Sequence, residues 1–156
     1  MTESAANAAS ATSRTLEEVE SQPWGDPPAD ASYLVARCYA LRRVPLNQLG
    51  TEDLRILLGQ SIGVLTLVPL ALRVLDGDPL AEGDFYPGDL LAAVLRLDAA
   101  YWTAHPEERT ELAGIAGRVD PTADELAGTE VPSLIAAFLA GRAGGDGGDG
   151  GDDSSV

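Results

Sequence analysis

The sequence has little of the residue types that commonly carry catalysis and metal binding. Its 156 residues include one cysteine, Cys38, and one histidine, His105. A lone cysteine excludes an internal disulfide, and we interpret Cys38 as a small buried side chain. His105 precedes Pro106 and two glutamates, a pattern typical of a helix start, and no nucleophile motif surrounds it. Because metal-ligand spacings, phosphate loops and dinucleotide fingerprints are also missing, we expect no enzyme activity, no catalytic residue, no metal and no cofactor.

Aromatic residues are scarce too, at 5% of the chain, so leucine, valine, isoleucine and alanine must form most of the core. The apolar share of 45% is ordinary for a globular protein. The sequence predicts an all-α fold, a compact bundle of about six to eight short helices, in one domain over residues 14–142. The ends, residues 1–13 and 143–156, are small and polar or rich in glycine and aspartate, and we expect both to be disordered.

The chain has few positively charged residues. Ten basic residues, all of them arginine, stand against 25 acidic ones, and the net charge is -15 at pH 7. Such a charge repels phosphate backbones and anionic lipid surfaces, so we expect neither nucleic acid nor a membrane as a partner. A cationic protein is the partner that it favours.

The longest uncharged run, residues 56–72, is near the lower length limit of a membrane span. Gly59, Gly63 and Pro69 interrupt it, which favours two buried helices with a break over residues 59–63. The N-terminus lacks the basic and apolar regions of a signal peptide, so we expect a cytoplasmic protein.

Several helix ends can be predicted from capping residues. Thr15 and Glu18 have capping-box spacing, as do Thr122 and Glu125, and Thr51 is placed as the cap of a third helix.

A further helix is expected over residues 32–43, capped by Asp30 or Ser32. Its spacing predicts Leu34, Cys38 and Leu41 in the core and Arg42 on the opposite face. Trp24, just before it, is interpreted as packing the preceding arm onto the helices.

The acidic stretch that follows the uncharged run is the strongest candidate for a function. Five carboxylates and no base lie between Arg73 and Arg96, and an adjacent Phe and Tyr could supply the apolar contacts of an interface with a basic protein. Taken singly, each residue fits a structural role better, Phe85 closing the loop and Tyr86 bonding a backbone group, and only their combination with the acids favours an interface. The candidate binding residues are Asp76, Asp78, Glu82, Asp84, Phe85, Tyr86 and Asp89.

A calcium loop does not fit this stretch. Counted from Asp76, position 5 is Leu80 and position 6 is Ala81, where an EF-hand needs an oxygen ligand and a glycine. A metal site of another kind is the less favoured alternative to a partner-facing surface.

Four segments resemble the immunity proteins of contact-dependent growth inhibition (CDI) systems, over about half of the chain. They are WGDPP from Trp24, YLVARCYALRRVPLNQLGTEDLRILLGQSIG from Tyr33, LVPLAL from Leu67 and DPLAEGDFYPGDLL from Asp78. DLRILLGQSIG and EGDFYPGDLL are the most specific parts. The resemblance implies a small cytosolic protein that binds one toxin domain and blocks it. A helical adaptor or regulatory module for a protein other than a toxin is the alternative, and the sequence predicts no particular oligomeric state.

Overall fold

The computed structural model describes residues 13–144. Within this range the chain forms eight α-helices and two short 3-10 helices and no strand, which confirms the all-α prediction. The elements are α2 (Leu16–Glu20), α3 (Tyr33–Leu41), η1 (Leu46–Gln48), α4 (Thr51–Gly59), α5 (Val64–Gly77), α6 (Asp89–Leu95), α7 (Ala99–Ala104), α8 (Pro106–Gly117), η2 (Asp124–Leu126) and α9 (Val131–Gly144). The two predicted tails lie outside the described residues, apart from Ser13 and the last two residues of α9.

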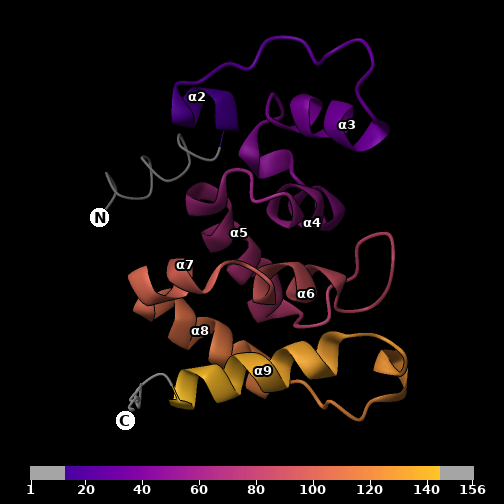
Figure 1. Cartoon of the computed structure of the whole chain (residues 1–156), viewed down its shortest axis with the longest axis vertical. Helices are drawn as coiled ribbons and strands as arrows, with labels where there is room; N and C mark the ends of the chain where they lie inside the picture. The colour runs from indigo at the N-terminus through magenta and orange to yellow at the C-terminus, as the bar shows by residue number, and fades with distance from the viewer. Residues whose placement is uncertain (1–12, 145–156) are drawn as a thin grey trace, which may run out of the picture.

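The helices follow the long axis of the molecule in chain order, from α2 and α3 at one end to α9 at the other (Figure 1). Helix α6 lies in the middle and contacts α4, α5 and α9. All 7 of its residues are buried. Its sequence, DLLAAVL, is apolar on every side after the first residue, so α6 is stable only when neighbouring helices cover it completely.

The uncharged run forms two helices, α4 and α5, as predicted. The chain turns between them at Gly63, whose φ of 65° lies in the left-handed region that favours glycine. A Cβ atom at this position would come within 2.8 Å of two carbon atoms of the buried Leu16. Glycine is therefore required both by the backbone and by the packing of α2. No helix within residues 13–144 has the length and apolar character that crossing a membrane requires.

Two of the four predicted caps differ in the structure, whereas Ser32 caps α3 as expected and accepts from the Val35 amide at 3.2 Å. Thr15 and Glu18 form the expected capping box, with backbone-to-side-chain bonds of 3.2 and 2.9 Å. Gly50, not Thr51, caps α4, because the helix begins at Thr51 itself.

The predicted capping box at Thr122 is wrong. The Thr122 amide and hydroxyl donate to the carboxylate of Asp120, at 2.9 and 2.7 Å, and only the 3-10 turn η2 follows.

In α3 and at its C-terminal end, the predicted burial is wrong for two residues. Cys38 and Leu41 are buried as expected, but Leu34 is 39% exposed and Arg42 only 1% exposed. The arm before α3 folds back over it, so that the Arg42 guanidinium pairs with Glu20 and lies 4.2 Å from the centroid of the Trp24 ring. The Trp24 ring also meets Tyr39 edge to face at 4.9 Å, as expected of a residue that packs the arm onto the helix.

Candidate functional site

The acidic loop, defined here as residues 76–89, runs from the end of α5 to the first residue of α6, Asp89, and this residue holds it from inside. Asp89 is 3% exposed. One of its carboxylate oxygens accepts a hydrogen bond from the Gly83 amide at 2.6 Å, and the other accepts from Phe85 at 3.0 Å and Tyr86 at 3.4 Å. The structure thus turns Asp89 away from the surface, and its charge fixes the loop backbone.

Helix α4 also holds this loop, through side chains that contact its backbone and Asp89. Glu52 accepts a hydrogen bond from the Asp84 amide at 2.8 Å and binds Arg55 through both carboxylate oxygens, at 2.6 and 2.5 Å. Arg55 lies 3.8 Å from the Asp89 carboxylate, which links the two acids. The hydrogen bond from Arg55 lowers the pKa of Glu52, and the same bond raises the pKa of Arg55. Both groups therefore stay charged over a wide pH range.

Gly83 is the point at which the loop and α4 meet most closely. A Cβ atom there would lie 2.3 Å from a carboxylate oxygen of Glu52 and 3.1 Å from one of Asp89. Any side chain at this position must displace one of the two acids. The loop therefore needs glycine here for space.

The loop backbone held by Asp89 and Glu52 leaves the Phe85 side chain on the surface, 67% exposed. The Arg55 guanidinium lies 4.4 Å from the centroid of its ring, a distance suited to a cation–π contact. Tyr86, the next residue, is partly buried and packs against the core. Phe85 therefore does not close the loop, and of the two aromatic candidates it is the one that is displayed.

The other four predicted acids are exposed but not equivalent. Asp76 pairs with Arg118 at 3.0 Å, and the Asp78 carboxylate accepts from the Leu80 amide at 3.2 Å. Asp84 lies beside the network of Glu52 and Arg55. Glu82 makes no ion pair or hydrogen bond within the described part of the chain, so its charge is fully available to a partner.

A hollow of about 470 Å³ extends this acidic surface toward the α8–α9 connection, residues 118–130. Both connections lie on the same side of the molecule (Figure 1). Leu80, Val119 and Ala123 supply apolar parts of the lining. Its carboxylates are Asp78, Glu82, Asp120 and Glu125. The one base in the lining, Arg118, is already paired with Asp76 outside it.

Sequence reasoning did not assign the acids of the α8–α9 connection or the pair on α4 to this surface. Asp120 and Glu125 are acidic, but nothing in the sequence shows that they face a loop some forty residues away. For Glu52 and Arg55 the signal is their i,i+3 spacing on a helix, which predicts an ion pair. Within residues 13–144, no group of three His, Cys, Asp or Glu side chains is placed to hold a metal ion.

His105 takes the structural position that its sequence context predicts. Its ring stacks on Tyr101 at 4.1 Å between centroids, and Nδ1 lies 2.8 Å from the Tyr101 carbonyl oxygen. The Tyr101 hydroxyl donates to Glu108, and burial raises the pKa of this hydroxyl. These contacts join α7 to α8.

Comparison with known proteins agrees with the resemblance seen in the sequence. The profile of the CDI immunity proteins matches residues 18–112. That range covers more than half of the chain, from α2 to α8, and includes the whole acidic loop. No curated protein matches the chain. The extent of the profile match shows that the chain belongs to the family of CDI immunity proteins.

Proposed function

We propose that this chain is a cytoplasmic immunity protein that binds a cognate toxin domain stoichiometrically and neutralises it, with the acidic loop as its docking surface. Family membership supports toxin binding. The observation that supports the acidic loop as the docking surface is the exposed Phe85 ring, which lies against Arg55 and follows the exposed Glu82 and Asp84 in the chain. An exposed aromatic ring on a fixed backbone loses little entropy on binding and is a common centre of protein interfaces.

The charge of this surface favours a basic protein surface as the partner. Glu82 and Asp84 precede Phe85 on the loop, and Glu82 also lines the acidic hollow. Charge pairs that lose water on binding couple by about 1.5 to 7 kcal/mol, whereas exposed pairs contribute about 1 kcal/mol or less. Lysine or arginine side chains of the toxin that enter the hollow would lose water in this way. The net charge of -15 would also speed their approach at low salt.

A co-expression test measures the proposal directly. The product of a neighbouring gene is captured with the wild-type chain and then expressed alone and together with it in growing cells. We expect a partner that stops growth alone and is harmless when this chain is present. Replacing Glu82 and Asp84 by lysine should abolish protection and weaken binding by at least about 100-fold, since two favourable charge contacts become repulsive.

The matched control carries the same change of charge elsewhere. Glu107 and Glu111 are exposed on α8 and lie outside the lining of the hollow. Their replacement by lysine should leave protection intact. Equal loss of protection in both double variants would mean that only overall charge matters, and a harmless partner would disprove the immunity function.

A further inference from the structure

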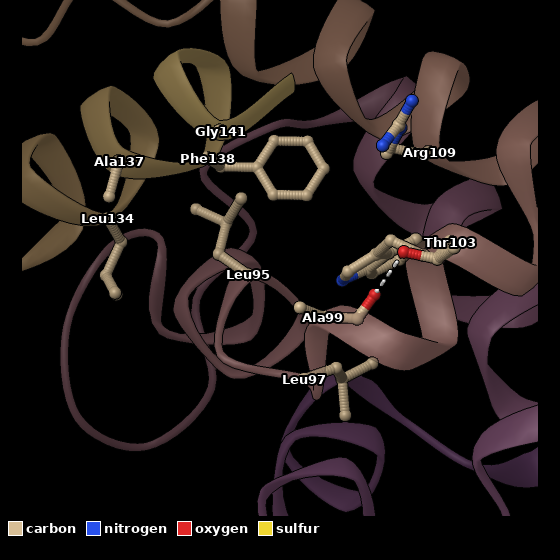
Figure 2. A pocket seen from close by; sticks show the side chains of 10 residues that line it. Leu95, Leu97, Ala99, Thr103, Arg109, Leu134, Ala137, Phe138 and Gly141 are labelled. Atoms are coloured by element: carbon tan, nitrogen blue, oxygen red, sulfur yellow. Dashed lines mark hydrogen bonds between the residues drawn. The ribbon is translucent and has the colours of Figure 1, made fainter. Parts of the chain in front are cut away.

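A second hollow of about 350 Å³ lies among α6, α7, α8 and α9, away from the acidic loop. Figure 2 shows Leu95, Phe138 and Arg109 around its open space. The walls are apolar, and Leu134 and Phe138 come from α9, which is outside the range matched by the CDI profile. Its volume falls within the range of pockets that bind small molecules.

Arg109 is the only charged residue of this lining. Arginines of this acidic chain are mostly paired: Arg37, Arg42, Arg43, Arg55, Arg96 and Arg118 each lie against a carboxylate. The Arg109 guanidinium has no ion pair or hydrogen bond within the described residues. A guanidinium without a partner beside apolar walls is complementary to an anion that carries an apolar body.

Trp102 adds a second group without a partner. Its side chain is 4% exposed, and the indole Nε1 finds no hydrogen-bond acceptor in the described part of the chain. Its ring meets Phe138 edge to face at 5.7 Å and so forms an aromatic wall of the pocket. Because the Nε1 atom itself is covered, Trp102 contributes its ring to the pocket and no hydrogen bond.

We propose that this pocket binds a small carboxylic acid with an apolar body. The apolar body lies between the Trp102 and Phe138 rings and the neighbouring leucines, and the carboxylate binds the Arg109 guanidinium through two parallel hydrogen bonds. This site is separate from the acidic loop. It does not depend on the proposed toxin binding.

Octanoate, below its micelle-forming concentration, is a suitable probe, with 1-octanol as its uncharged counterpart. The chain has two tryptophans, so the Trp24→Phe variant leaves Trp102 as the only indole that reports on binding. We expect octanoate to change the Trp102 emission in a saturable way and calorimetry to give the same affinity. Octanol should bind more weakly, because it cannot pair with Arg109.

Arg109→Gln should weaken octanoate binding by about 10- to 100-fold, the usual effect of losing a hydrogen bond to a charged group, and leave octanol binding unchanged. Arg73→Gln is the matched control, since Arg73 is exposed on α5, also lacks an ion pair and lies outside the pocket. Ala137→Phe should fill the pocket and abolish binding of both probes while Arg109 is retained. Absence of saturable binding by both methods, or equal octanoate affinity in Arg109→Gln, would overturn the proposal.

Discussion

The two connections that border the acidic hollow are held in different ways. The acidic loop is fixed by the buried charge of Asp89 and by Glu52 and Arg55 on α4. The charged contacts of the α8–α9 connection are exposed, namely Asp120 bonded to Thr122 and Arg118 paired with Asp76, and the buried Val119 and Leu126 anchor it in the core. A charge used inside the protein to fix a loop cannot also contact a partner. The acidic loop therefore offers Phe85 and Glu82 on a backbone fixed by buried charge, whereas the α8–α9 connection is anchored by apolar side chains and keeps its acids exposed.

Removing the buried charge should have the largest effect on this difference. In Asp89→Asn one oxygen becomes an amide group that faces backbone donors, and the contact with Arg55 loses its opposite charge. We expect the free energy of unfolding to fall by about 2 to 4 kcal/mol, because the buried network loses one acceptor oxygen and the negative charge that both bind its donors. Urea denaturation measures this loss. Hydrogen exchange should show faster exchange at the amides of Gly83, Phe85 and Tyr86.

Asp120→Asn makes the same chemical change in the other connection. The Asp120 carboxylate is exposed, and within residues 13–144 its hydrogen bonds are to Thr122 alone. Its variant should unfold at nearly the urea concentration of the wild type. If both variants lose equal stability, the two connections are not held differently.

The acidic loop also shows how far the sequence predicts this site. Composition and spacing indicate helices, the break between α4 and α5 and the acidic stretch itself, because these depend on neighbouring residues. Asp84 and Asp89 look alike in the sequence, yet one is exposed and the other buried. Which acid turns inward depends on how the loop returns to α6 and meets Glu52, 32 residues before Asp84. Arg42 is a similar case, since a folded arm that covers a helix leaves no trace in that helix's periodicity.

The Glu52–Arg55 ion pair on α4 should make the stability of the protein depend on pH in the acidic range. Arg55 lowers the pKa of Glu52 below its ordinary value of 4.5 in the folded state. A carboxylate of this kind contributes stability that is present above the unfolded pKa and is lost as the pH falls through the folded pKa. Between about pH 5 and pH 3, the wild type should therefore lose more stability than Glu52→Gln, which has no charge to lose at this position. Urea denaturation across this range tests the difference, and parallel curves for the two proteins would contradict it.

The smallest effect on stability is expected at Arg118, at the start of the α8–α9 connection. Its pair with Asp76 is exposed on both sides, and such pairs contribute about 0 to 1 kcal/mol, so Arg118→Gln should unfold almost as the wild type does. The same substitution removes the one base that lines the hollow and frees the Asp76 carboxylate. A basic toxin should then associate faster, with a gain that fades as salt screens the charges. Stopped-flow association at low and high salt measures this, and slower association in Arg118→Gln would mean that the partner surface facing the hollow is not basic.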